Sequence, residues 1–500
     1  MRIFTSIAML LLLSACGGSA NKSDSYNSNT KWQRGEFMPS SYYANRCINP
    51  RSDINYQDLV GTYKDENNWL RSWSHETYLW YNELPDIDPA LIEDPNEFFD
   101  LMKTDARTSS GQDKDRFHFT YDTDGWNQLS ESGISMGYGA QFKVTFEPYT
   151  RAFITYTEPN SPARSANLGR GTEIIATDGL LLSSIDSQES YEKFLAAAYP
   201  STLGESHTFT IRELNADADR TVILQSAITT EQPVHTSKVF TQNNKKIGYV
   251  LFNSFNVATA EEQLINTISS LVIQNIDALI LDLRYNLGGY LAIASELGSM
   301  IAGDQAIGSI YTELIYNDKR SMENESYRFP SEAYGLSVAE GTVLPQLNLS
   351  KVYILSSGDT ASASEYLING LRGIDVEVIL IGGITTGKPY GYLPEDNCGT
   401  TYFTIQFKGQ NTKGYGDFAD GFIPSNYDNG RDRVRGCEVT DDLSHLLGDE
   451  NERMLATALH YIENNQCPVT ANNSTSKPVH PLSTVSGRLL KPHPTGLISR

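Results

Sequence analysis

Short apolar runs alternate with amphipathic segments along residues 231–467. Four runs have the length and near-continuous apolar character of buried strands: residues 246–252, 278–283, 351–355 and 379–381. Apolar residues recur at helical spacing in four other segments: residues 261–274, 291–301, 366–372 and 451–462. A further strand is predicted over residues 401–407. This alternation predicts an α/β domain.

Two preceding regions have different patterns. Residues 131–230 consist of short strand patterns separated by turn residues, which predicts a small β domain. Residues 41–130 are mainly helical in pattern, and Trp69, Trp73 and Trp80 fall near one face of a helix predicted over residues 67–81. Residues 120–125 have part of the spacing of a calcium-binding loop, but the first position is Thr rather than Asp, so we interpret them as a turn.

Three strand ends in the α/β region carry small residues and candidate chemistry. Residues 357–365 form a strand-to-helix turn of Ser, Thr, Ala and Gly, residues 286–289 end in a Gly pair, and residues 382–391 form a Gly-rich loop with one lysine. Hydroxyl residues before a helix are usually caps. A serine at such a turn can also be a nucleophile with N–H donors beside it, and Lys388 supplies a base, which together predict a Ser/Lys hydrolase.

Composition narrows the class of partner. The chain has 500 residues, enough for two to four domains, and a net charge of −22, which argues against a nucleic-acid partner. The sequence has no CxxC or HExxH motif, so we expect neither a zinc site nor another cofactor. A Ser-His-Asp enzyme is disfavoured because no GxSxG motif occurs and none of the eight histidines lies in a Gly-rich strand-end loop.

The N-terminal residues predict export and a flexible tether, and the C-terminal residues predict a disordered tail. Residues 1–15 have a basic start and an apolar core at residues 7–13, and residues 13–17 resemble the lipobox of a bacterial lipoprotein signal. The resemblance implies cleavage before Cys16 and lipid attachment to it, in a cell envelope, with the outer membrane favoured; an ordinary signal peptide with an incidental cysteine is the alternative. Residues 16–40 predict a flexible tether, and residues 468–500 predict a disordered tail.

Four further cysteines allow three disulfide pairings in an exported chain. We favour Cys398–Cys437, which would join two loops of one domain, together with Cys47–Cys467, which would tie the two ends of the globular region.

Four motifs in order resemble peptidase family S41, the C-terminal processing or tail-specific serine peptidases. They are residues 247–250, 282–289, 360–365 and 386–388. The resemblance implies a multidomain α/β protein with a ClpP/crotonase-like catalytic core over residues 231–467. It also implies a PDZ-like domain over residues 131–230 and places the chain in the lipoprotein branch, with a helical N-terminal domain over residues 41–130.

The resemblance also implies site residues. Ser362 would be the nucleophile, with Ser364 as a weaker alternative, and Lys388 the base. The oxyanion donors would be the N–H groups of Gly288 and Ala363. Glu365 would either align the pair or serve only as an acid at a helix N-terminus. Many members carry a Gln one turn after the lysine, where this chain has Tyr392, so the third partner is open.

In the PDZ-like region the resemblance implies a peptide-carboxylate loop formed by Gly137, Tyr138, Gly139 and Ala140. The expected function is therefore a serine endopeptidase that cleaves exported or envelope polypeptides at C-terminal or unfolded segments. A catalytically inactive peptide-binding lipoprotein is the alternative. An acyl-CoA enzyme lacks any nucleotide-binding motif, and the oligomeric state is open.

Overall fold

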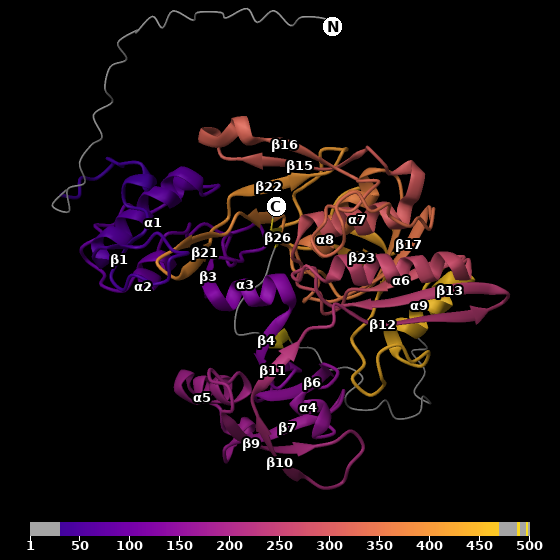
Figure 1. Cartoon of the computed structure of the whole chain (residues 1–500). Coiled ribbons are helices and arrows are strands. Elements are labelled where there is room, and N and C mark those ends of the chain that lie inside the picture. Colours follow the sequence, from indigo (N-terminus) through magenta and orange to yellow (C-terminus); the bar gives the residue numbers. More distant parts are fainter. Residues whose placement is uncertain (1–30, 470–487, 491–496, 499–500) are drawn as a thin grey trace, which may run out of the picture.

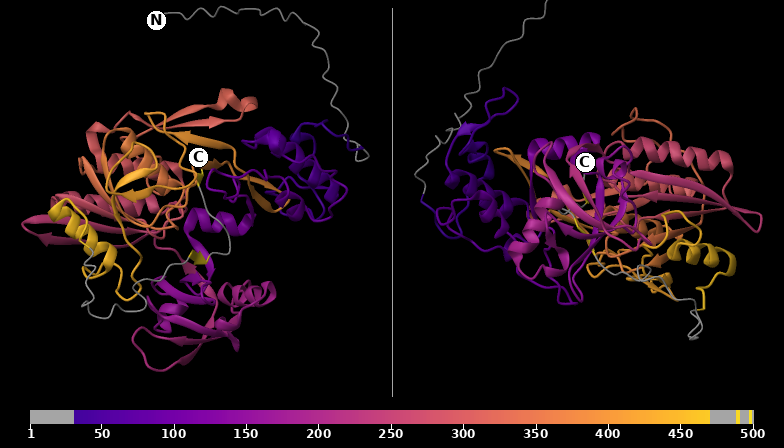
Figure 2. Two further views of the ribbon diagram at one scale, coloured as in Figure 1. Left: turned by 180° about the vertical axis from the view of Figure 1, so that it is seen from behind. Right: turned by 90° about the horizontal axis from the view of Figure 1, so that it is seen from below.

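The computed structural model describes residues 31–469, 488–490 and 497–498 (Figure 1). The predicted signal peptide and the lipidation residue Cys16 lie outside this range. The chain forms a multidomain α/β protein. The α/β domain and the N-terminal region lie side by side, and the small β domain projects from them in Figure 1 and in the view from behind in Figure 2.

The main sheet of the α/β domain has seven strands in the order β12-β13-β14-β17-β18-β24-β23. Its strands are β12 (Val234–Gln242), β13 (Lys245–Phe252), β14 (Ala278–Asp282), β17 (Lys351–Ser356), β18 (Glu377–Gly382), β23 (Ile423–Ser425) and β24 (Arg433–Glu438). Strand β12 is antiparallel to β13, and the other neighbours are parallel. The carboxyl ends of β14, β17 and β18 therefore meet at one edge of the sheet.

Both faces of this sheet are covered. Helices α6 (Ala260–Gln274), α7 (Leu291–Ala302) and α8 (Ala363–Gly373) share one hydrophobic core, and α9 (Arg453–Asn464) packs in a second core on the other face. Alternate residues of β13 divide between the two cores: Val250 and Phe252 in the first, Tyr249 and Leu251 in the second. This double coverage explains the near-continuous apolar runs in the sequence.

A second sheet lies beside the first, in the order β16-β15-β22-β19-β26. Its strands are β15 (Ile310–Tyr316), β16 (Glu325–Arg328), β19 (Tyr390–Tyr392), β22 (Phe407–Gln410) and β26 (Leu497–Ile498). The prediction of a single strand over residues 401–407 is wrong. One strand ends at Phe403 and pairs with the N-terminal region, and a second strand, β22, begins at Phe407 and pairs with β15 in another sheet.

The small β domain has the path β10-β9-β7-β6-β5-β25, with β8 beside β7. Its elements are β5 (Ala140–Thr145), β6 (Arg151–Thr157), α4 (Pro162–Ser165), β7 (Glu173–Thr177), β8 (Leu180–Leu181), α5 (Gln188–Ala198), β9 (Ser206–Arg212), β10 (Arg220–Gln225) and β25 (Arg488–Leu490). A ribbon of β4 (Ile134–Gly137) and β11 (Ala227–Thr230) joins it to the rest. The disordered tail predicted over residues 468–500 is thus wrong for residues 488–490 and 497–498, which pair as strands with existing sheet edges.

The N-terminal region is held to the α/β domain by a shared sheet. Its elements are β1 (Arg46–Cys47), β2 (Leu59–Val60), α1 (Tyr63–Thr77), α2 (Pro95–Asp100), β3 (Phe119–Asp122) and α3 (Thr123–Ser132). Strand β3 pairs with β21 (Thr400–Phe403), which pairs with β20 (Glu395–Asn397). Within the residues that the structure describes there are also five short 3-10 helices: Ser40–Tyr42, Tyr81–Glu83, Leu182–Ser184, Gly303–Gln305 and Asp318–Glu323.

Two local predictions in this region need correction. Helix α1 ends at Thr77, because Tyr78 turns to extended backbone, so Trp80 is not on the helix that carries the stacked pair Trp69 and Trp73. Residues 120–125 are not a plain turn: they close strand β3, and the Asp122 side chain then accepts the Gly125 N–H to cap helix α3.

The disulfides are Cys47–Cys398 and Cys437–Cys467. The favoured pairing was therefore wrong. The β20–β21 hairpin carries Cys398 away from its own domain to the N-terminal region, where the Asn45 N–H donates to the Asn397 side chain at 2.8 Å. Cys437 instead lies in β24, beside the chain that leaves α9. Among the described helices none has the length and apolar character needed to cross a membrane.

Candidate active site

Ser362 lies where strand β17 passes into helix α8. It occupies the N-cap position with φ of 58° and ψ of −113°, a region that residues other than glycine rarely enter. Its side chain is fully buried, and its hydroxyl makes no hydrogen bond with the residues that the structure describes. Ser362 and Glu365 stand at the two positions of a capping box, and the Glu365 carboxylate accepts the Ser362 N–H.

The remaining hydroxyls of this turn are all in use. Ser357 donates to the Arg284 carbonyl, and Thr360 donates to the Leu283 carbonyl at 2.8 Å. Ser364, the alternative nucleophile, donates to the Asn286 carbonyl at 3.0 Å. The turn is thereby fastened to the segment that follows β14, and Ser362 is distinguished from its neighbours.

Gly288 lies directly against Ser362. A Cβ atom on Gly288 would lie 2.8 Å from the Ser362 Cβ and 2.9 Å from the Ala363 nitrogen, and its φ is +100°, so the position requires glycine. The two predicted oxyanion donors are thus brought together at the serine. The Gly288 N–H, however, donates to the Asn286 side chain at 3.0 Å.

Lys388 lies in the loop between β18 and β19, and its side chain is buried. Its Nζ donates to the Tyr392 hydroxyl at 2.6 Å, and that hydroxyl donates to the carbonyl of Phe117 from the N-terminal region. The ammonium position lies 3.9 Å from the centroid of the Tyr392 ring. Burial lowers the pKa of Lys388 well below its usual value, although Asp115 and Glu365 oppose the shift.

Glu365 joins the serine turn to the lysine loop. Its Oε2 accepts the backbone N–H of Ser362 at 2.9 Å and that of Lys388 at 2.8 Å. Its Oε1 accepts the Thr385 hydroxyl at 2.5 Å and the Gly387 N–H at 2.7 Å. The carboxylate thus accepts the N–H of the helix N-cap and also contacts the lysine loop, and its role in catalysis stays a prediction. Burial raises the pKa of Glu365, and the four donors oppose that shift.

One cavity of about 640 Å³ extends from the small β domain to this site. Its lining includes the predicted peptide-binding loop, Gly137, Tyr138, Gly139 and Ala140, and also Leu287 and Gly288. The Tyr138 side chain is buried in the core of the small domain, so only the remainder of that loop is available to a ligand. The cavity therefore extends from this loop to Gly288, the residue that lies against Ser362.

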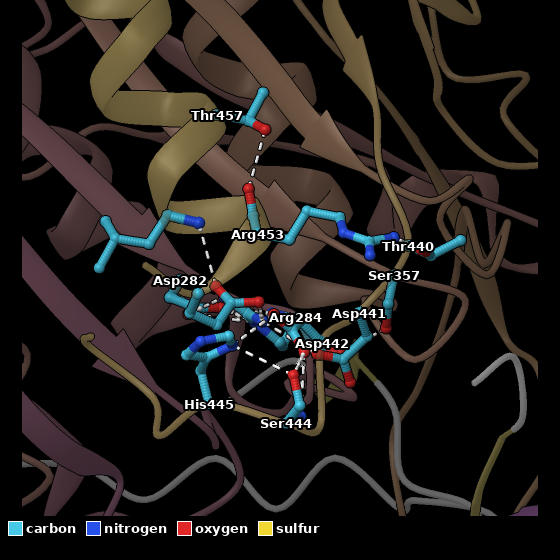
Figure 3. Close-up of polar contacts among 12 residues, drawn as sticks. Asp282, Arg284, Ser357, Thr440, Asp441, Asp442, Ser444, His445, Arg453 and Thr457 are labelled. Carbon is cyan, nitrogen blue, oxygen red and sulfur yellow. Dashed lines mark hydrogen bonds and ion pairs between the residues drawn. The ribbon is translucent and has the colours of Figure 1, made fainter. Parts of the chain in front are cut away.

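A buried ionic cluster supports the strand that leads to Gly288 (Figure 3). Arg284 is fully buried and binds Asp282 at 2.8 Å, Glu452 at 2.8 Å and Asp441 at 3.0 Å. Asp441 also binds two cations of the small β domain, Arg170 at 2.7 Å and Lys143 at 3.4 Å. Sequence reasoning missed Asp441, Glu452 and Arg170; the only signal was Arg284 itself, a cation beside an otherwise apolar strand.

A serine, a histidine and an aspartate also meet in this part of the molecule (Figure 3). Both Asp442 and Ser444 contact the same ring nitrogen, Nδ1 of His445, at 2.8 and 3.1 Å. In a catalytic triad the two partners bind opposite ring nitrogens. Ser444 moreover donates to Asp442, so this is a local loop contact. The described residues contain no group of three or more side chains suited to hold a metal ion.

Comparison with known proteins identifies two regions of the chain. The profile of Peptidase family S41 matches residues 246–395, which include Ser362, Glu365 and Lys388, and that of the Peptidase S41 N-terminal domain matches residues 65–121. The Carboxyl-terminal-processing protease of Picosynechococcus sp. is 28% identical over 261 residues, which are 52% of this chain and 56% of that protein. Carboxyl-terminal-processing peptidase 3, chloroplastic, of Arabidopsis thaliana is 25% identical over 259 residues, 50% of this chain and 45% of that protein.

These matches span about half the length of the curated relatives. Among solved structures, an S41 protease from Bacteroides fragilis NCTC 9343 superposes with a TM-score of 0.59 and 23% identity, covering 83% of this chain and 100% of that one. That likeness concerns the fold. Together, the two profile matches and the curated relatives show that residues 246–395 are similar to the peptidase domain of family S41, and that residues 65–121 are similar to its N-terminal domain.

Proposed function

We propose that the chain is a serine endopeptidase with Ser362 as nucleophile and Lys388 as general base. One observation carries the proposal: the Glu365 carboxylate accepts the backbone N–H groups of both Ser362 and Lys388. Two loops that end different strands are thereby held together beside Gly288, at the wall of a cavity large enough for a peptide segment.

The chemistry is acyl transfer. The Ser362 oxygen attacks a peptide carbonyl carbon, its proton passes to the neutral Lys388 amine, and the negative charge develops on the carbonyl oxygen. The protonated Lys388 then gives the proton to the leaving amine as the C–N bond breaks. Water attacks the resulting ester, with Lys388 again taking and returning a proton. The N–H groups of Gly288 and Ala363 stabilise the oxyanion in both halves.

A neutral Lys388 suits this task. A lysine has a usual pKa of about 10.4, and keeping it neutral near pH 7 costs roughly 4.6 kcal/mol, which burial can supply. The neutral amine has two N–H donors and one lone pair. It can donate to Tyr392, as observed, and keep the lone pair for the Ser362 proton. Tyr392 then fills the orienting position in which related enzymes carry Gln.

Substrate binding has to complete the site. The Ser362 hydroxyl must turn toward Lys388, and the Gly288 N–H must leave Asn286, its present acceptor at 3.0 Å. Catalytic hydrogen bonds often form only in the substrate complex.

The proposed substrates are exported polypeptides, entering by their C-terminal or unfolded segments. The cavity that joins Gly139 to Gly288 supports this route, and we propose that the small β domain is PDZ-like, with a peptide added to its edge. Residues 1–15 as signal peptide and Cys16 as lipid anchor in the cell envelope are part of the proposal.

The test is cleavage of an unstructured protein such as casein by the wild type, Ser362→Ala and Lys388→Ala. Both variants should lose at least 1,000-fold in kcat/KM, while Ser364→Ala, a matched change in the same turn, should keep activity within about tenfold. Cleavage by Ser362→Ala would refute the assignment. The unpartnered Ser362 hydroxyl favours one rival, a peptide-binding protein without activity; in that case the wild type binds unfolded peptides but does not cleave them.

A further inference from the structure

The C-terminal segment of this chain forms a strand on the edge of the small β domain. Strand β25 pairs antiparallel with β5, with Arg488 opposite Val144 and Leu490 opposite Phe142. Without β25, β5 would be the edge strand of its sheet. The pairing runs toward Ala140, where the cavity-lining loop ends. A backbone added antiparallel to such an edge is one way in which proteins bind extended peptides.

The same segment forms a second strand beside the proposed catalytic lysine. Strand β26 pairs parallel with β19, with Leu497 opposite Gly391 and Ile498 opposite Tyr392. Strand β19 begins two residues after Lys388 and carries the hydroxyl that accepts its hydrogen bond. Without β26, β19 would also be a sheet edge.

The two pairings lie within reach of one extended peptide. Seven residue steps separate Leu490 from Leu497, and an extended chain of that length spans at most about 25 Å. The cavity described above lies between the β5 end of the small domain and Gly288. The tail therefore has one contact at the peptide-type edge and another at the strand next to Lys388.

We propose that the C-terminal segment is an intramolecular ligand that occupies the peptide path in the resting protein and competes with polypeptide substrates for it. Strand pairing uses backbone hydrogen bonds, so it depends little on which side chains the ligand carries. An extended substrate can therefore pair with the same two edge strands. Attachment to the same chain gives the segment an effective concentration in the millimolar range, so weak pairing suffices. The competition with substrate rests on the proposed function, whereas binding of the segment does not.

Binding is tested first, with Ser362→Ala protein so that nothing is cleaved. A fluorescent peptide of residues 484–500 is titrated into the full chain and into a chain ending at Asn473, which keeps Cys467. The shortened chain should bind at least tenfold more tightly, because its edges are vacant. A peptide with Pro at positions 489 and 498 lacks two backbone N–H groups and should bind at least tenfold more weakly. Equal binding by both chains, or no binding, would overturn the proposal.

Competition is tested by steady-state cleavage. The shortened chain should show a KM lowered at least fivefold with kcat within twofold of the full chain. The full-length double variant L489P/I498P should behave in the same way, and N473P, upstream of both strands, should match the wild type. The difference should be independent of enzyme concentration; a dependence would place the tail in a second copy and refute the intramolecular form. Peptide binding with no cleavage by any variant would remove the proposed function and keep the ligand.

Discussion

The Lys388 amine and the Tyr392 hydroxyl are joined by a hydrogen bond of 2.6 Å inside a site that excludes water. The Tyr392 hydroxyl in turn donates a hydrogen bond to the Phe117 carbonyl of the N-terminal region. The position of the lysine thus depends on two domains at once. A residue that looked like a departure from the family pattern is the direct partner of the proposed base.

Replacement of Tyr392 by Phe should lower kcat/KM about 10- to 100-fold. The ring still packs, but the amine loses an acceptor and the Phe117 carbonyl loses a donor. Y392Q, which restores a polar partner, should recover part of the loss. Y390F removes a hydroxyl from the same strand and should change kcat/KM less than threefold. Wild-type activity of Y392F together with a loss in Y392Q would argue that Tyr392 matters only for packing.

The pH dependence of cleavage should report Lys388. Burial lowers its pKa well below 10.5, so kcat/KM should rise with pH as the amine loses its proton and then level off before pH 10. K388R stays protonated at every pH in this range and should be inactive throughout. A profile whose basic limb rises only near pH 10.5 would remove Lys388 as the neutral base.

The same shift predicts a change in stability with a definite sign. Because the unfolded chain holds the Lys388 proton up to about pH 10.4 while the folded chain has already released it, the unfolded state binds more protons in that interval. The unfolding free energy should therefore rise with pH from the lowered pKa to about pH 10.4. K388M should lack this rise, as measured by urea unfolding at several pH values. Parallel curves for the two proteins would contradict the shift.

Replacement of Glu365 by Gln should uncouple the serine turn from the lysine loop. Each carboxylate oxygen accepts two donors, and an amide NH₂ in place of one oxygen leaves two buried N–H or O–H groups unsatisfied. We expect a loss of about 2–4 kcal/mol in stability and at least 100-fold in kcat. The readout that separates positioning from simple destabilisation is kcat at a temperature at which the variant is fully folded. Recovery of wild-type kcat there would exclude a positioning role.

The elements set by local patterns were predictable. Strands β13, β14 and β17 match the predicted strands at residues 246–252, 278–283 and 351–355 to within one residue at each end. They were predictable because a strand buried on both faces needs a nearly continuous run of apolar residues. The proximity of Ser362 to Gly288 also followed, since adjacent parallel strands end at one edge.

What failed was decided by contacts between distant segments. Cys398 could not be paired from sequence because nothing local shows that the β20–β21 hairpin reaches the N-terminal region. The strands at residues 488–490 and 497–498 lie in a polar, Pro-containing tail that has no strand pattern of its own. They are extended because they pair with the edge strands β5 and β19, which are distant in the sequence. Asp441 gave no signal, since a buried acid is recognisable only from the cations around it.

Loss of the Cys47–Cys398 disulfide should affect activity as well as stability. It fastens the N-terminal region, which supplies the Phe117 carbonyl, to the domain that carries Tyr392. The pair C47S/C398S should lower the thermal midpoint and also reduce kcat. The Cys437–Cys467 bridge joins residues 30 apart in the sequence and lies away from the site. The pair C437S/C467S should therefore lower the thermal midpoint, with little change in kcat at a temperature at which the variant is folded. Peptide mapping without reduction checks the connectivity itself.

Asp441 should prove to be the residue that joins the small β domain to the active-site strand. It binds Arg170 and Lys143 from one side and Arg284 from the other, all buried. Burial works to raise its pKa, but these cations outweigh it and hold the pKa well below 3.8. Because the folded pKa is depressed, the stabilising contribution is present above about pH 3.9 and is lost as pH falls through the lower value.

Asp441→Asn keeps the shape and removes the charge, so three buried cations lose a shared partner, and we expect a loss of about 3–5 kcal/mol. The exposed pair of Lys193 and Glu189, 2.7 Å apart, offers a matched control: Glu189→Gln should cost less than about 1 kcal/mol. Urea unfolding and a double-mutant cycle with R170M measure both. Additive losses in that cycle would mean that Asp441 and Arg170 act independently, and that the small domain is held to the site by other contacts.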